Sequence, residues 1–338
     1  MSATQPDRTT VLSAIELATR APSVHNTQPW RWQLGDHTVH LYADWDRQVR
    51  ATDPDGRDLV VSCGAALHHL RVALRASGWH TTVHRVPNPA YPAHLASIEV
   101  RRHAPTDDDV LLSGTILRRR SDRRPLSSWP VPSSHIDRMI AAAAKAGALL
   151  VPVSDPVTRA KLIAAIAEAA RQQESDRDYA LEIASWSGRG PFAIDGVLAA
   201  SSPAKASTHS RIPMRTFPGG TLPAYLGDDG ADEATVLLAL ATAGDDTISQ
   251  LRAGEAASAA LLAATELGLA TCPLSQALEV ADTRQAVATD VLEDAAMPQL
   301  LIRVGWAPTT ASRLPSSPRR PLADVVSELG SDERNGHH

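Results

Sequence analysis

The sequence has few cysteines and few aromatic residues, and it lacks a long apolar run. Cys63 and Cys272 lie far apart, so neither a disulfide framework nor a zinc site is indicated. With seven Trp, four Tyr and two Phe, the core must consist mostly of Ala, Leu, Val and Ile. No uninterrupted apolar stretch reaches membrane-spanning length. Residues 1–7 lack the basic-then-apolar order of a secretion signal, so we expect a cytoplasmic protein without a membrane partner.

Charge and length set further limits. The chain has 33 Lys and Arg against 38 Asp and Glu, and the net charge of −5 argues against a nucleic-acid partner. Its 338 residues predict two domains or one large α/β unit. The adjacent His68 and His69 would point apart on a helix, and His80 and His84 have no carboxylate nearby in the sequence, so we predict no metal site. No Gly-rich dinucleotide fingerprint follows a predicted strand.

Residues 21–30, which read APSVHNTQPW, are the most informative stretch. They follow an apolar-periodic run that is typical of an amphipathic helix, and Pro22 ends that run. The next residues offer hydroxyl, imidazole and carboxamide groups beside Trp30. Such a loop can surround a flat heteroaromatic ring with an alternating donor and acceptor edge, as in a flavin. It can equally be a helix-ending turn whose Ser and Asn satisfy local backbone groups.

The pattern Pro-Ser-x-x-Asn-x-Gln-Pro-Trp in this stretch resembles the N-terminal signature of the FMN-dependent nitroreductase superfamily. It specifically resembles the Acg family, whose members have two fused nitroreductase-like halves. The similarity extends from about Val11 to about Val326, with one weak central gap. It implies an α+β, FMN-dependent nitroreductase-like fold that is internally duplicated into a single-chain pseudo-dimer. It also implies that the loop contributes cofactor-binding residues, namely Pro22, Ser23, His25, Asn26 and Gln28.

Two Ala-rich segments support an internal duplication. Residues 64–78 and 254–268 both run from Gly to Gly over the same number of residues, with helical spacing and small side chains. The resemblance places such helices at the nitroreductase dimer interface, which would be intramolecular here. Ala-rich helices can also look alike by chance. We therefore expect a first half over residues 1–105 and a second over 106–338, with a monomer feasible and a dimer possible.

Residues 118–125, which read RRRSDRRP, form the densest charge run. Such a run is often a solvated face or a linker. It can also form a local anion site, because guanidinium pairs bidentately with phosphate. The run resembles the nitroreductase Arg-x-Ser-x-Arg phosphate motif, which maps onto Arg119, Ser121 and Arg123. Asp122 departs from the usual small or apolar filler and leaves open which arginines point inward.

Two later segments complete the expected cofactor site. Predicted strands cover residues 235–241 and 298–305, with a long helix and a loop between them. In the family, the similar loop places backbone N–H groups beside the flavin ring, which implies contacts from Pro273, Leu274 and Ser275. Near the C-terminus, Arg319 and Arg320 resemble a basic phosphate clamp, although such residues can also belong to a disordered tail.

Residues 174–232 match no core nitroreductase element. This central segment contains Trp186 and several Gly- and Pro-rich turns. Segments of this length without periodicity are usually functional or disordered. The resemblance suggests a lid over the flavin, and the alternative is a surface excursion.

The Arg-x-Ser-x-Arg motif is absent from the first half, and the Pro-Ser-x-x-Asn pattern is absent from the second. We therefore expect one composite FMN site, with the ring loop from the first half and the arginines from the second. The expected function is NAD(P)H-dependent reduction of nitroaromatic or quinone-like acceptors through bound flavin. The alternative is a flavin-sequestering or storage protein whose lid blocks the site. A more distant reading is an anion-binding regulatory protein without flavin. The sequence assigns no catalytic residue.

Overall fold

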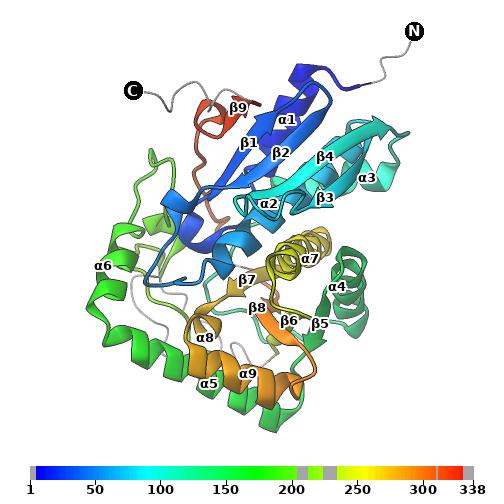
Figure 1. Cartoon of the computed structure of the whole chain (residues 1–338). Coiled ribbons are helices and arrows are strands. Elements are labelled where there is room, and N and C mark those ends of the chain that lie inside the picture. Colours follow the sequence, from blue (N-terminus) through cyan, green and yellow to red (C-terminus); the bar gives the residue numbers. More distant parts are fainter. Residues whose placement is uncertain (1–4, 204–211, 224–233, 310, 330–338) are drawn as a thin grey trace.

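The chain forms two β-sheets, each with its own helices, which meet through two long helices (Figure 1). We describe a computed structural model of the chain over residues 5–203, 212–223, 234–309 and 311–329. None of the helices within these residues is both long and apolar enough to cross a membrane. The structure therefore combines helices and sheets in the α+β manner that the sequence predicts.

The first sheet has the strand order β3-β4-β2-β1-β9. Its β2 alternates half-buried and buried residues along Thr-Val-His-Leu-Tyr-Ala, so one face lies on the core, as expected of an antiparallel sheet. Helices α1 and α2 pack against that face. The elements are α1 (Arg8–Ala18), β1 (Trp30–Leu34), β2 (Thr38–Ala43), α2 (Arg57–Ala76), β3 (Trp79–Arg85), β4 (His94–Arg102), α3 (Asp107–Ile116) and β9 (Val326–Glu328).

The second sheet has the order β5-β6-β8-β7 and is covered on both faces. Helices α4 and α7 pack on one face, and α5 and α9 pack on the other, along the lower edge of Figure 1. Its elements are α4 (Ser133–Ala146), β5 (Leu149–Pro152), α5 (Pro156–Glu174), α6 (Arg177–Ser185), β6 (Val236–Thr242), α7 (Thr247–Glu266), β7 (Ala270–Leu274), α8 (Gln276–Glu279), α9 (Ala281–Leu292) and β8 (Met297–Gly305).

The predicted strands near residues 235 and 298 are confirmed as β6 and β8. Both are buried along nearly their whole length, which explains their continuous apolar sequences. The segment from residue 269 to 279, expected to be a loop, is instead largely regular. Its first part pairs with β8 as β7, with Ala270 opposite Gly305, and its last part forms the short helix α8.

The two Ala-rich helices pack against each other as α2 and α7. Their backbones touch where Gly64 faces Gly254, because a Cβ added at Gly254 would lie 2.0 Å from the Val61 carbonyl oxygen. A Cβ at Gly64 would lie 2.1 Å from the Leu251 carbonyl oxygen. The contact that joins the two sheets therefore requires glycine on both helices. An origin of these halves by duplication stays a prediction.

The C-terminal segment returns to the first sheet. Strand β9 pairs in parallel with β1, with Val326 opposite Trp32, although it follows the second sheet in the sequence. Residues 311–329 therefore cross the boundary expected near residue 105, and the division into two halves stays a prediction. The crossing brings Arg319 and Arg320 to the N-terminal loop.

Candidate functional site

The loop after α1 has a strained backbone. His25, Asn26 and Gln28 have φ angles of 46°, 58° and 52°, in the left-handed region that non-Gly residues seldom adopt. The Ser23 hydroxyl accepts the Gln28 N–H at 3.0 Å, and the Val24 N–H donates to the Ser62 hydroxyl on α2 at 3.1 Å. Strain of this kind persists where surrounding contacts impose it, which is typical of functional sites.

The loop forms one wall of a large cavity between the two sheets, which we call the ring cavity. Its empty volume is about 970 Å³, including space open to solvent, and such a size is typical of small-molecule sites. The lining comes from this loop, from α2 and α7, from β7 with α8, and from the central segment. Of the predicted site residues, it includes Pro22, Ser23, His25, Ser121, Arg123, Pro273, Leu274 and Ser275.

A second hollow, the arginine recess, adjoins the ring cavity. It has an empty volume of about 510 Å³ and shares Pro22, Ser23, Ser121 and Arg123 with the ring cavity. Its further lining includes Asn26 of the N-terminal loop, Arg119 and Arg120 of the arginine motif, and Arg319 from near the C-terminus. The predicted N-terminal loop and the arginine motif therefore meet in space.

Arg119 is a buried cation of this recess whose side chain lacks hydrogen-bond acceptors among the described residues. Its side-chain Nε and Nη1 are buried and have no hydrogen-bond partner among the described residues. Burial, together with the nearby charge of Arg120, lowers the pKa of Arg119 to about 10. Burying a guanidinium without an acceptor is costly, and an anion in the recess would remove that cost. The arrangement therefore fits a ligand with an apolar ring system and an anionic end.

Asp122 determines which arginines face the recess. Its carboxylate accepts hydrogen bonds from Arg124 Nε at 2.9 Å and Arg124 Nη2 at 2.7 Å. The Asp122 N–H also donates to the Thr271 carbonyl on β7 at 2.8 Å, which fixes the motif on the second sheet. Arg124 is thereby held away from the recess, and Arg118 is exposed. This pairing explains the acidic residue within the motif.

Arg319 and Arg320 have other partners in the structure. The Arg319 guanidinium donates to the carbonyls of Thr19, Arg20 and Ala21 at the end of α1, and to Asn26 Oδ1. Arg320 donates its N–H to Gln28 Oε1, and Gln28 Nε2 donates to the Ile194 carbonyl. These contacts position the N-terminal loop. A phosphate contact from either arginine, and a ligand contact from Gln28, stay predictions.

The central segment supplies part of the ring-cavity wall. Pro213, Met214, Arg215 and Phe217 line the cavity. The Phe217 ring contacts the His25 ring edge to face, with centroids 5.7 Å apart, and the Arg123 guanidinium lies 4.7 Å from the Phe217 ring centre. The Trp186 ring, which the sequence had singled out, instead packs against Arg47 at 5.3 Å. Residues 204–211 and 224–233 of the predicted lid lie outside the described residues.

Several cavity residues escaped the sequence analysis. Asp58 and Ser62 on α2, and Arg215 in the central segment, line the ring cavity. Arg215 forms a buried ion pair with Glu279 and contacts His25 Nε2 at 3.2 Å. Burial, together with the charges of Arg215 and Arg123, lowers the pKa of His25 well below its usual value, so His25 is neutral at pH 7. No local motif marks Asp58 or Arg215, because packing alone brings them together.

The structure is a two-sheet protein with a large cavity and an arginine-lined recess where the sheets meet, and comparisons with known proteins establish its family. The family model described as "Nitroreductase family" matches residues 116–306. Two Mycobacterium tuberculosis proteins, both named "Putative NAD(P)H nitroreductase", are similar over nearly the whole chain. The first, MT3217, is 46% identical over 95% of this chain and 92% of its own length. The second, Acg, is 37% identical over 96% of this chain and 97% of its own length. The chain belongs to the nitroreductase family.

Solved structures show a more distant likeness. The FMN-dependent nitroreductase NfnB from Mycobacterium smegmatis, in complex with NADPH, is 17% identical, with a TM-score of 0.42 over 65% of this chain and 99% of that chain. A Bacteroides fragilis nitroreductase with bound FMN is 14% identical, with a TM-score of 0.38 over 60% of this chain and 90% of that chain.

Proposed function

We propose that the chain binds FMN non-covalently, with the isoalloxazine ring in the ring cavity and the phosphate in the arginine recess. The observation that carries the proposal is the buried Arg119 guanidinium, whose Nε and Nη1 have no acceptor among the described residues. It lines the arginine recess, which shares lining residues with the ring cavity. A terminal phosphate would supply acceptors in a geometry that guanidinium matches. The related Mycobacterium tuberculosis proteins are named as NAD(P)H nitroreductases, which supports a redox role for the site.

The proposed reaction is reduction of nitroaromatic or quinone-like acceptors with NAD(P)H. Bound FMN would supply the redox chemistry, and the protein would supply binding and orientation. His25, Ser62 and Ser275 would present polar groups to the ring from three different elements. Since His25 is neutral at pH 7, it would act as a hydrogen-bonding group there and not as a cation.

The test is a visible spectrum of the purified protein under anaerobic conditions, before and after addition of NADPH or NADH. The proposal expects a flavin absorbance that NAD(P)H bleaches and that a nitroaromatic or a quinone restores. A protein that stays colourless after incubation with FMN would rule out the proposed ligand. A coloured protein whose flavin neither NADPH nor NADH reduces would support FMN binding and refute the proposed reaction.

A second candidate is flavin sequestration, in which the central segment blocks the ring. It is favoured by the packing of Phe217 against His25 at the cavity wall. Hydride transfer requires the nicotinamide close to the ring and aligned with it, so a covering side chain would slow reduction whatever the driving force. Phe217→Ala would then accelerate flavin reduction by NAD(P)H, whereas Phe192→Ala, in the same segment but 96% exposed, would not. Equal rates in the wild type and both variants would favour an ordinary reductase.

We also propose one flavin per chain and a cytoplasmic location. A single ring cavity and arginine recess would use the loop of the first sheet and the motif docked on the second. The buried free thiols of Cys63 and Cys272 suit a reducing compartment. A monomer is feasible because the α2–α7 contact already lies within one chain.

A further inference from the structure

A buried acid faces the ring cavity from the first turn of α2. Asp58 is 4% exposed and belongs to the cavity lining. Oδ1 forms an ion pair with Arg57 Nη2 at 2.6 Å, and neither carboxylate oxygen has a hydrogen-bond partner among the described residues, so Oδ2 has no polar contact there at all. Its backbone N–H donates to Asp53 Oδ1 at 3.0 Å. Asp58 is therefore held by its backbone and one ion pair, with one oxygen left for a proton or a ligand.

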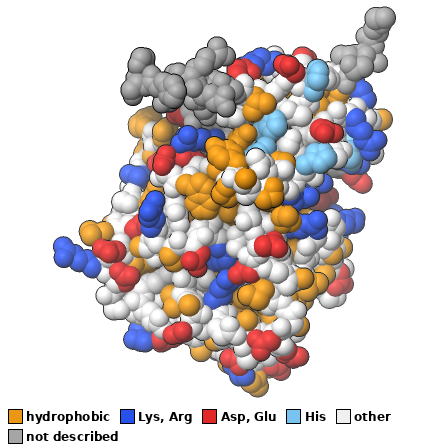
Figure 2. All heavy atoms as spheres, in the orientation of Figure 1, with side chains coloured by type: hydrophobic (Ala, Val, Ile, Leu, Met, Phe, Trp, Pro, Cys, Tyr) orange, Lys and Arg blue, Asp and Glu red, His pale blue; other side chains and the backbone are white. Residues whose placement is uncertain are grey.

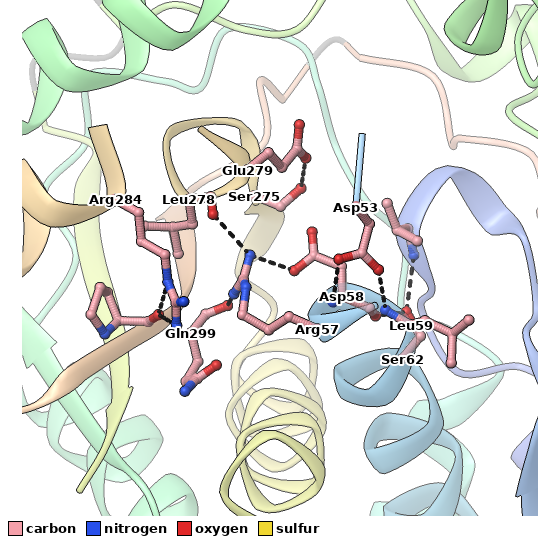
Figure 3. A network of polar contacts seen from close by, with 12 residues as sticks. Asp53, Arg57, Asp58, Leu59, Ser62, Ser275, Leu278, Glu279, Arg284 and Gln299 are labelled. Atoms are coloured by element: carbon pink, nitrogen blue, oxygen red, sulfur yellow. Dashed lines mark hydrogen bonds and ion pairs between the residues drawn. The ribbon is translucent and has the colours of Figure 1, made fainter. Parts of the chain in front are cut away.

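The charges around Asp58 leave it without full compensation. Two guanidinium groups, Arg57 and Arg215, face three carboxyl groups, Asp53, Asp58 and Glu279. Arg215 is already paired with Glu279, and Arg57 also donates to the backbone carbonyls of Leu278 and Gln299. Figure 3 shows Arg57 between Asp58 and the Leu278 carbonyl, with Asp53 beside Asp58. One proton shared among the carboxyl groups would balance this cluster.

The same cluster reaches a third hollow, which we call the outer recess. Asp53, Arg57 and Glu279 line it, together with Asp55 and Gln285, whose side chains are exposed. The Arg57–Asp58 pair thus stands between the outer recess, which Arg57 lines, and the ring cavity, which Asp58 lines. Asp53 lines the outer recess and accepts the backbone N–H groups of Asp58 and Leu59, so a second carboxyl group lies between Asp58 and that recess.

We propose that Asp58 is the proton-exchanging group of the ring cavity, which gains a proton from solvent through the outer recess when an apolar ring displaces water from the cavity. The exchange forms one O–H bond on the Asp58 carboxylate, and the proton comes from the solvent. This inference rests on the proposed flavin binding, because the ring supplies the displacement of water. Reduction of a quinone or nitro group consumes protons as well as hydride. An acid beside the ring that regains its proton from solvent therefore suits the proposed reaction.

The other titratable groups of the cavity are poorly suited to this exchange. Burial raises the pKa of Asp58 to about 7, against the opposing charge of Arg57, and Asp53 and Glu279 raise it further. Burial keeps His25 neutral by lowering its pKa, and keeps Cys272 neutral by raising its pKa. Because Asp58 titrates near neutral pH, further loss of water from its surroundings would move its pKa upward and cause proton uptake.

Infrared spectroscopy tests the titration of Asp58 directly. In the protein without ligand, the C=O stretching band of a protonated carboxylic acid should disappear as the pH rises through about 7. The band should be lost in Asp58→Asn and retained in Asp55→Asn, a matched variant at the exposed rim of the outer recess. A titrating band that persists in Asp58→Asn would overturn the assignment, and so would the absence of such a band from the wild type.

Calorimetry tests the exchange itself. Binding of FMN is measured at pH 7.5, slightly above the Asp58 pKa of about 7, in buffers of different ionisation enthalpy, which gives the number of protons taken up. Wild type and Asp55→Asn should take up more protons than Asp58→Asn, and the difference cancels any proton exchanged by the phosphate. Equal uptake in all three proteins would overturn the proposal. Absence of FMN binding in all three would refute the proposed function instead, while the infrared result for Asp58 would still stand.

Discussion

Neighbouring arginines of the 118–124 motif differ in burial and in their contacts, and these differences indicate different roles. Arg119 is buried against the recess with two nitrogens lacking an acceptor among the described residues, whereas Arg124 is paired with Asp122. Arg118 is exposed. The sequence predicted a phosphate motif but left open which arginines point inward, because that depends on the docking of Asp122 at Thr271 of β7. A contact between residues so distant in the chain has no local signature.

Replacing Arg119 is expected to weaken FMN binding strongly. Each charge-assisted contact to a desolvated phosphate contributes about 1.5–3 kcal/mol, so Arg119→Ala should reduce affinity roughly ten- to a hundredfold. Arg119→Lys should recover only part of this loss, because the planar fork is absent. Fluorescence titration with FMN measures the affinity, and the exposed Arg118→Ala is the control. Equal affinities for Arg118→Ala and Arg119→Ala would contradict the arrangement of the recess.

The Asp58 carboxyl also predicts how stability depends on pH. Its pKa is raised from 3.8 to about 7 on folding, so the unfolded state loses this proton at lower pH than the folded state. Stability should therefore fall as the pH rises from about 4 to about 7, by at most about 1.4 kcal/mol per pH unit from this group. Urea unfolding at several pH values measures the slope. Asp58→Asn should flatten it relative to Asp55→Asn, and an unchanged slope would argue against the raised pKa.

At the scale of elements, α2 and α7 carry the joint between the sheets and also line the ring cavity. Their Ala-rich patterns predicted long helices whose small side chains permit close approach, and the family resemblance implied that the two helices contact each other. The Ala-rich pattern of the first helix starts at residue 64, whereas α2 begins at Arg57. The missed first turn is the part that presents Asp58 to the cavity, because polar residues there carry no apolar periodicity.

Adding a methyl group at the crossing of these helices should destabilise the protein. Gly64→Ala and Gly254→Ala place a Cβ about 2 Å from a backbone carbonyl oxygen of the other helix, which forces the helices apart. A cost of about 1–3 kcal/mol or more is expected from such overpacking. Gly114→Ala in α3 meets no atom within 4 Å and should be neutral or stabilising by up to about 1 kcal/mol. Thermal unfolding of the three variants compares these effects, and similar midpoints would refute the tight crossing.

At the scale of the whole molecule, the proposed site lies where the two sheets meet. The N-terminal loop borders the first sheet, the arginine motif is docked on the second, and the C-terminal residues hold the loop in place. On the face shown in Figure 2, acidic and basic side chains are interspersed, as the near balance of charges predicts. The family could be predicted from the sequence. The acid cluster of the outer recess could not, because it joins α2, α8 and the central segment only after folding.

The proposed site would bind one FMN between the two sheets. The most direct measurement is the identity and amount of ligand released by heat from purified protein after incubation with excess FMN and removal of the unbound fraction. We expect FMN at close to one equivalent per chain, because one ring loop and one arginine motif combine into one site. A protein that retains no FMN, or one that retains close to two equivalents, would contradict it.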